Sequence, residues 1–159
     1  FDGLILSGGP GDPRDLGPII QEAAAIYQAQ IPVFAMGLGH QVMALAAGMK
    51  VKKLPYGHRS SSHPVREMES GIIAITAQNH GFAVDADSVA PDVATISHMH
   101  VNDKTVEGLT YRRPHLFSVQ FTPETQTVSF GIKNQYDRFR DELDAINGIQ
   151  PGHTAERGE

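Results

Sequence analysis

Cysteine and tryptophan are absent from this sequence of 159 residues, and its apolar runs are short. Without cysteine the chain can form no disulfide, no thiolate metal site and no thioester intermediate. No run approaches the roughly 18 apolar residues that a membrane-spanning helix needs, so the sequence predicts no contact with a membrane. No basic and apolar leader opens the sequence, and we therefore expect a cytoplasmic location.

Basic residues are also few. Lysine and arginine number 13 against 18 acidic residues, and the formal net charge is −5. This balance provides no basic surface for nucleic acid, which we exclude as a partner. The 16 glycines and 10 prolines are too few for a disordered composition. A chain of this length buries roughly 70% of its unfolded surface, so we expect one globular domain.

The first third of the chain predicts alternating strands and helices. Residues 1–6 and 31–36 are short apolar strands, and residues 16–27 have the apolar spacing of a helix. A second helix is predicted over residues 41–47, closed by Gly48 in a left-handed conformation. This order is typical of a parallel α/β unit with right-handed crossovers.

The rest of the chain has a different pattern. Short alternating strands separated by turn residues favour antiparallel hairpins, at 50–54, 72–77, 82–84, 93–96 and 105–111. A compact strand follows over residues 116–121, and residues 134–146 predict an amphipathic helix. We expect Phe139, Leu143 and Ile146 to face inward from this helix. The polar residues 147–159 predict a flexible C-terminal tail.

Five segments carry a recognisable order of motifs: Leu6–Pro13, Phe34–Gln41, Gly57–Pro64, Thr76–Phe82 and Ser118–Glu124. Together they resemble the class I glutamine amidotransferases, and within that family the glutaminase domain of the carbamoyl-phosphate synthetase small chain. The resemblance implies an α/β, flavodoxin-like fold with a central, mostly parallel sheet, flanking helices and a small antiparallel hairpin region. It assigns residues 1–146 to a partial amidotransferase domain, truncated before its first strands.

The resemblance also implies a reaction. The family hydrolyses glutamine to glutamate and ammonia, which passes to a large synthetase subunit, and it uses no cofactor in this step. A cysteine at a sharp turn is the nucleophile, a histidine is the base and a glutamate orients it. In this sequence Gly37 occupies the nucleophile position and Thr122 the base position, and only Glu124 is retained. We therefore predict that glutamine hydrolysis is lost.

The binding half of the family's site is better preserved. By resemblance, the backbone amides of Gly9 and Leu38 correspond to the oxyanion hole. The residues at the family's glutamine contacts are Gly9, Gly11, Gln41, Asn79, Gly81 and Phe82. Amide side chains and glycines suit a small polar ligand, although the glycine-rich segments are also ordinary turn sequences.

Three functions stay open for such a chain: a scaffold or regulatory subunit for the large synthetase subunit, a module that binds glutamine, and a hydrolase in which Thr122 replaces the nucleophile.

The histidines of the sequence need a separate interpretation. His40, beside the turn, is interpreted as a structural hydrogen-bonding residue. His98 and His100 have the spacing of two ligands on one strand face, with His58 and His63 nearby in sequence. Because no carboxylate pattern accompanies these histidines, the sequence predicts no metal site.

Overall fold

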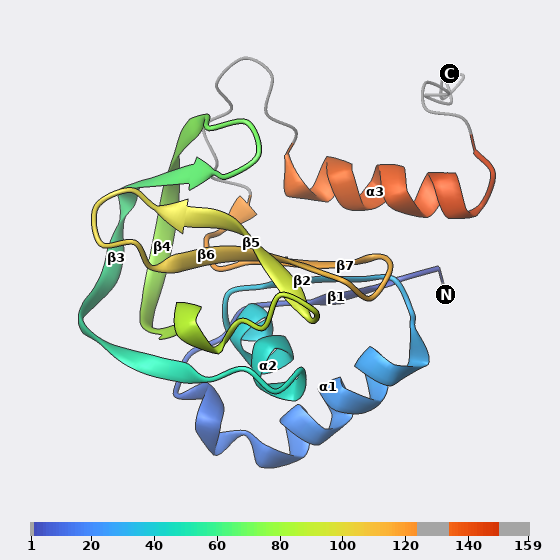
Figure 1. The fold of residues 1–159 in the computed structure, drawn as a ribbon, viewed down its shortest axis with the longest axis horizontal. Helices are drawn as coiled ribbons and strands as arrows, with labels where there is room; N and C mark the ends of the chain where they lie inside the picture. Colours follow the sequence, from blue (N-terminus) through green and yellow to red (C-terminus); the bar gives the residue numbers. More distant parts are fainter. Residues whose placement is uncertain (1, 124–133, 150–159) are drawn as a thin grey trace, which may run out of the picture.

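The structure, a computed structural model, describes residues 2–123 and 134–149. Its centre is a seven-stranded sheet (Figure 1) with the strand order β1-β2-β7-β6-β5-β3-β4. The strands are β1 (Leu4–Leu6), β2 (Val33–Met36), β3 (Val51–Glu67), β4 (Ile73–Val84), β5 (Ala94–His100), β6 (Val106–Tyr111) and β7 (Leu116–Val119). Two short 3-10 helices, Pro13–Asp15 and Ala86–Ser88, lie in the connections.

The sheet is mixed. In the described residues β1, β2 and β7 pair in parallel, whereas the four remaining pairings are antiparallel. The α/β class is confirmed, but the parallel part is smaller than predicted and the antiparallel strands continue the same sheet. The connection lengths explain this result, because β5, β6 and β7 follow one another through short turns, and a short turn can join only antiparallel neighbours.

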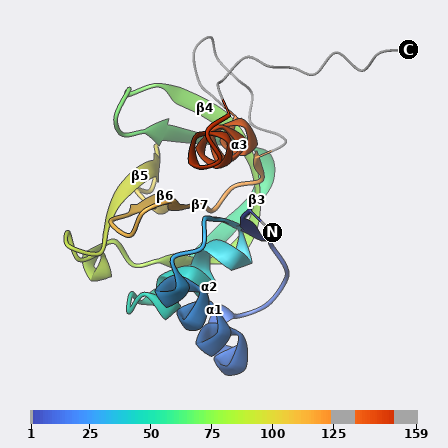
Figure 2. The same ribbon diagram turned by 90° about the vertical axis from the view of Figure 1, so that its right-hand side faces the viewer.

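Helices cover both faces of the sheet. Helices α1 (Gly17–Ala29) and α2 (Leu38–Ala46) lie together on one face, and α3 (Gln135–Ile146) lies on the other, as the turned view in Figure 2 shows. No helix in the described residues is long and apolar enough to cross a membrane.

Strand β2 contributes to two hydrophobic cores, one on each face. Val33 and Ala35 belong to the core under α1 and α2. Phe34 points to the opposite face and stacks on Phe117, with ring centroids 4.9 Å apart, and both contact Phe139 of α3. All four β2 residues are buried, as expected for a strand covered on both sides.

Strands β3 and β4 are longer than the sequence predicts. The pattern indicates a strand only at 50–54 on one side of the hairpin and two separate strands on the other, yet the ladder runs from Val51↔Val84 to Arg66↔Ile73. Glycine, serine and proline at 57–64 have low strand propensity, and cross-strand pairing overrides it. Two register shifts accommodate the surplus residues of β3 as bulges.

Of the remaining predicted details of the helices, some are confirmed and one is wrong. Gly48 has a φ of +89°, which confirms the left-handed position after α2, although α2 begins at Leu38 rather than at residue 41. Phe139 is buried and Leu143 packs against the same core. The prediction that Ile146 faces inward is wrong, because it is the last residue of α3 and is 46% exposed. Most of the predicted tail, beyond residue 149, lies outside the described residues.

Gly39 of α2 lies close against β1. A Cβ at this position would collide with the carbonyl oxygen of Leu6. We expect Gly39→Ala to lower the free energy of unfolding by about 1–3 kcal/mol in urea denaturation, despite the better helix propensity of alanine. Gly17→Ala is the matched control, since nothing lies within 4 Å of its added Cβ. Equal stability of the two variants would contradict the close approach.

Candidate functional site

The turn between β2 and α2 is centred on Gly37. Its φ of +56° and ψ of −120° are strained for residues with a side chain. Its N–H donates to the carbonyl of Val119 at 3.0 Å, which ties the turn to β7. A Cβ built on Gly37 would lie 3.2 Å from the Cα of Gly8. The turn therefore holds its residue at the end of a buried strand and directly before a helix N-terminus.

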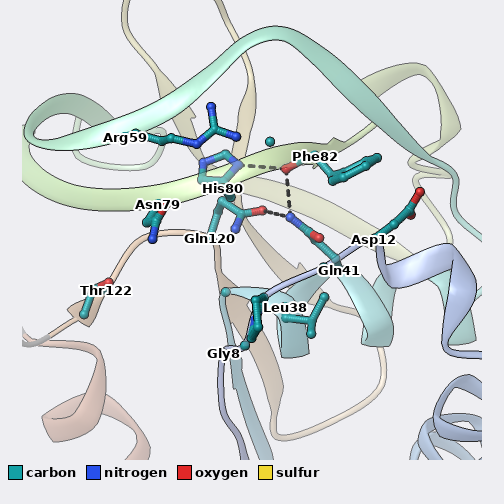
Figure 3. Close-up of a pocket in the computed structure, with 15 residues that line it drawn as sticks. Gly8, Asp12, Leu38, Gln41, Arg59, Asn79, His80, Phe82, Gln120 and Thr122 are labelled. Carbon is teal, nitrogen blue, oxygen red and sulfur yellow. Dashed lines mark hydrogen bonds between the residues drawn. The ribbon is translucent and has the colours of Figure 1, made fainter.

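A cavity of about 600 Å³ opens above this turn (Figure 3). Its walls come from the loop after β1, the start of α2, the β3–β4 hairpin and the segment after β7. The lining residues are Gly8, Gly9, Pro10, Gly11, Asp12, Gly37, Leu38, Gln41, Arg59, Asn79, His80, Gly81, Phe82, Gln120 and Thr122. Every site residue predicted from the sequence is among them except Glu124, which lies outside the described residues.

Gln41 forms the buried floor of this cavity. Its side-chain Nε2 donates to the carbonyl oxygen of Phe82 and to Oε1 of Gln120, both at 2.8 Å. Because the Phe82 carbonyl can only accept, the amide nitrogen must face it. Both amide hydrogens are thus used within the protein, and the group that Gln41 can offer to a ligand is its oxygen, an acceptor.

The cavity also contains charged groups that the sequence analysis did not assign to it. Arg59 lines it from β3, and Arg14 binds Asp12 through a pair of hydrogen bonds of 2.6 and 2.9 Å. The Arg14 hydrogen bond lowers the pKa of Asp12. The carboxylate is therefore already paired, and Arg59 supplies positive charge at the cavity wall.

Sequence reasoning also missed His80 and Gln120 as lining residues. Both residues lie inside the motif segments that resemble the family, next to Asn79 and Phe121. Their position in these segments could have indicated that they line the cavity. His80 Nδ1 lies 2.7 Å from the Phe82 carbonyl oxygen, and its Nε2 lies 2.8 Å from Gln78 Oε1. Burial lowers the pKa of His80 to about 4, even though the Phe82 carbonyl opposes this shift. Each ring nitrogen of His80 thus faces an oxygen atom of the protein.

His40 does not line the cavity. Its side chain is completely buried, with Nδ1 2.7 Å from Ser118 Oγ. Burial lowers its pKa to about 3, so the ring is neutral over the physiological range. These contacts agree with the structural role expected from the sequence, where His40 joins α2 to β7.

Backbone N–H groups complete the site. Leu38 is the first residue of α2, and the first N–H groups of a helix have no acceptor within the helix. Gly9 packs directly on this residue, since a Cβ built on Gly9 would lie 3.3 Å from Leu38 Cδ2. The two positions predicted as an oxyanion hole therefore lie against one another beside Gly37.

Comparison with known proteins identifies the family of the chain. A family model described as "Glutamine amidotransferase class-I" matches residues 1–141. The chain belongs to the class I glutamine amidotransferase family. It is 44% identical over 139 residues to the carbamoyl phosphate synthase small chain of Symbiobacterium thermophilum, covering 87% of this chain and 38% of that protein. The small chain of Akkermansia muciniphila is 50% identical over 123 residues, which cover 77% of this chain and 32% of the relative.

The chain thus spans less than half the length of the curated relatives it matches.

Solved structures of amidotransferases share its fold. The glutaminase domain of Trypanosoma brucei CTPS, solved with bound acivicin, superposes with a TM-score of 0.67 at 16% identity, over 94% of this chain and 72% of that one. A glutamine amidotransferase from Thermotoga maritima gives a TM-score of 0.61 at 19% identity, over 90% and 65% of the two chains.

The neutral, buried ring of His40 predicts sensitivity to acid. An unfolded histidine binds its proton near pH 6.5, whereas His40 in the fold does so only near pH 3. The unfolded state therefore binds more protons in this window, and the free energy of unfolding falls as the pH falls, by up to about 1.4 kcal/mol per pH unit for this group. In urea titrations between pH 4 and 6, His40→Asn should be less pH-dependent than the wild-type chain by about this amount.

His115→Asn is the matched control for this prediction, since it removes a histidine whose side chain is 44% exposed. An identical pH slope in wild-type chain and His40→Asn would contradict the assignment of His40 as a neutral buried ring.

Proposed function

We propose that this chain is an amidotransferase domain of the carbamoyl phosphate synthase small-chain type that binds glutamine but does not hydrolyse it. The observation that carries the proposal is Gly37, which stands at the sharp turn before α2, where the resemblance expects the family's nucleophile, and lines a cavity together with Gly9, Leu38 and Gln41. A glycine has no atom that can attack the amide carbon and hold the acyl group.

The lining groups suit an amino acid with an amide side chain. The Gln41 oxygen is an acceptor for the α-ammonium group, and Arg59 is a cation for the α-carboxylate. The N–H groups at Gly9 and Leu38 can donate to the side-chain carbonyl of the ligand, at the helix start where negative charge is favoured. These groups support binding of glutamine without requiring a nucleophile.

A hydrolase that uses Thr122 is the weaker candidate. Thr122 is the only hydroxyl residue among the described residues that line the cavity. A hydroxyl needs a base to activate it, and the one imidazole among the described lining residues, His80, has Nδ1 directed at the Phe82 carbonyl and Nε2 directed at Gln78.

The small-chain resemblance also suggests a partner. The curated relatives are small chains of a synthase, and we infer that this chain associates with a large synthetase subunit as a scaffold or regulatory component. Co-purification of the two from cells that express both would support the association.

Loss of hydrolysis is tested by ammonia release. The chain should release no more ammonia from glutamine than a heat-denatured sample, since removing the nucleophile of a comparable hydrolase costs on the order of 10⁶ in turnover. Turnover at the rate of an ordinary amidotransferase would overturn the proposal.

Restoring the two lost groups provides the positive test. Gly37→Cys with Thr122→His should produce measurable ammonia release, while Gly37→Ala with Thr122→His stays silent and shares the same backbone. Both variants should lose about 1–3 kcal/mol of stability, because a side chain at φ +56° is strained. Activity in the alanine control would show that Gly37 is not the missing nucleophile.

Binding is tested separately by calorimetric titration with glutamine. Gln41→Met removes the acceptor at similar length and should weaken binding by roughly ten- to a hundredfold, the cost of a lost hydrogen bond to a charged group. Gln28→Met, on the exposed side of α1, is the control. The absence of any heat up to millimolar glutamine would remove the binding role.

A further inference from the structure

His80 joins the cavity to a second group of polar side chains between β3, β4 and β6. His58 of β3 and Glu107 of β6 are 5% and 0% exposed. One ring nitrogen of His58, one of His80 and one carboxylate oxygen of Glu107 all lie within 4.8 Å of one another. The hydrogen bonds around these three residues determine which of their atoms face inward.

The ring nitrogen of His58 that points away from Glu107, Nε2, is hydrogen-bonded to Asp103. His58 Nε2 lies 2.6 Å from Asp103 Oδ2, and a carboxylate can only accept there. Nε2 therefore carries the hydrogen. In a neutral ring the other nitrogen, Nδ1, then has a lone pair, and it points toward Gln78 Oε1 at 3.0 Å and Glu107 Oε1 at 3.3 Å.

The outer nitrogen of His80 is fixed in the same way. Its Nδ1 lies 2.7 Å from the carbonyl oxygen of Phe82, which also accepts from Gln41 and cannot donate. The hydrogen of a neutral His80 is therefore on Nδ1. Its Nε2 presents a lone pair to Gln78 Oε1, 2.8 Å away.

The side chain of Gln78 cannot turn to supply a donor. Its Nε2 lies 3.0 Å from Thr76 Oγ1, and the hydroxyl hydrogen of Thr76 is already donated to the carbonyl of His63 at 2.9 Å. Thr76 Oγ1 must consequently accept from Gln78, which places the amide oxygen of Gln78 toward the two histidines.

Glu107 completes the group from the buried side. Neither of its carboxylate oxygens receives a well-aligned hydrogen bond from the residues that the structure describes. A fully buried carboxylate needs a cation or hydrogen-bond donors to offset its loss of hydration. When the His58 ring is neutral, four acceptor atoms face one another: His58 Nδ1, His80 Nε2, Gln78 Oε1 and Glu107 Oε1. A proton on His58 Nδ1 is the alternative partner for the Glu107 carboxylate.

We propose that these four atoms form a binding site for a divalent transition-metal ion, with zinc as the best match. Two imidazoles and a carboxylate are the donor set that zinc accepts and that magnesium and calcium do not favour. Asp103 and the Phe82 carbonyl are then the outer acceptors that orient the two ligating histidines, as in most protein metal sites.

The spacing fits such an ion with small movements. Ligand atoms bound to tetrahedral zinc at about 2.0–2.2 Å lie roughly 3.3–3.6 Å apart. Three of the six distances among these four atoms are 2.8, 3.0 and 3.3 Å, so these pairs need to separate by only a few tenths of an ångström. The ligand atoms of His58, His80 and Glu107 all lie within 4.8 Å of one another. Protons on the two inner ring nitrogens are the competing occupants, and metal binding would release them.

In a neighbouring group of histidines the contacts between ring nitrogens can form without a metal, although His63 Nε2 receives no well-aligned hydrogen bond from the described residues. His63 Nδ1 and His100 Nε2 are hydrogen-bonded to each other at 3.1 Å, and the backbone N–H of Asn102 donates to His100 Nδ1 at 3.2 Å. Here a donor hydrogen is available for each contact between nitrogens. His63 therefore serves as a control within the same histidine-rich region.

The experiment is calorimetric titration of zinc into the whole chain after treatment with a chelator and dialysis. We expect one saturable site per chain, with far weaker binding of magnesium. Glu107→Gln and His80→Asn should each weaken zinc binding by at least tenfold, and Asp103→Asn by about ten- to a hundredfold. His63→Asn and His115→Asn should change it by less than twofold.

Cobalt reports on the geometry, because tetrahedral coordination gives an intense visible absorption that should disappear in Glu107→Gln. Circular dichroism and metal-free thermal unfolding establish that each variant is folded. If Glu107→Gln does not fold, His80→Asn decides the question. The proposal is overturned if the folded wild-type chain shows no saturable zinc site, if Glu107→Gln and His80→Asn both bind zinc as tightly as the wild type, or if magnesium binds equally well.

Discussion

The whole site depends on a close approach between two stretches of backbone. The loop after β1 passes so near the turn at Gly37 that a Cβ there would lie 3.2 Å from Gly8 Cα, and a Cβ on Gly39 would meet the Leu6 carbonyl. This contact sets the width of the cavity and places the first N–H groups of α2 against Gly9. A glycine at the turn relieves the strain that a catalytic side chain would impose. The fold is therefore compatible with a glycine at this position.

The cavity residues could be predicted because they lie in short motifs that resemble those of a known family. Gly9 follows β1 and Thr122 follows β7, whereas Gln41 lies near the start of α2 and Asn79 lies within β4, and all four line the cavity. The β3–β4 hairpin was harder to predict. Its central residues have weak strand propensity, and only the partner strand defines them as β-structure. Cross-strand pairing of this kind is not visible in local patterns.

The histidines illustrate a second limit of the sequence. The i,i+2 spacing of His98 and His100 suggested a shared face, but His98 packs on Phe121 while His100 contacts His58 and His63. His58 and His63 are five residues apart, which would place them on opposite faces of a regular strand. A bulge between Ser60 and His63 adds one residue and restores a common side. Glu107 was hidden within an apolar strand, so the carboxylate needed to complete a metal site was not recognised.

Hydrogen bonds connect the two functional regions. The Phe82 carbonyl accepts from Gln41 on the cavity side and from His80, and His80 reaches Gln78 and thus His58. An occupant among His58, His80 and Glu107 would set the tautomer of His80 and hold the Phe82 carbonyl in place. That carbonyl in turn holds the amide of Gln41, whose oxygen faces the cavity. Charge in the buried cluster and the shape of the ligand pocket are therefore coupled through one backbone oxygen.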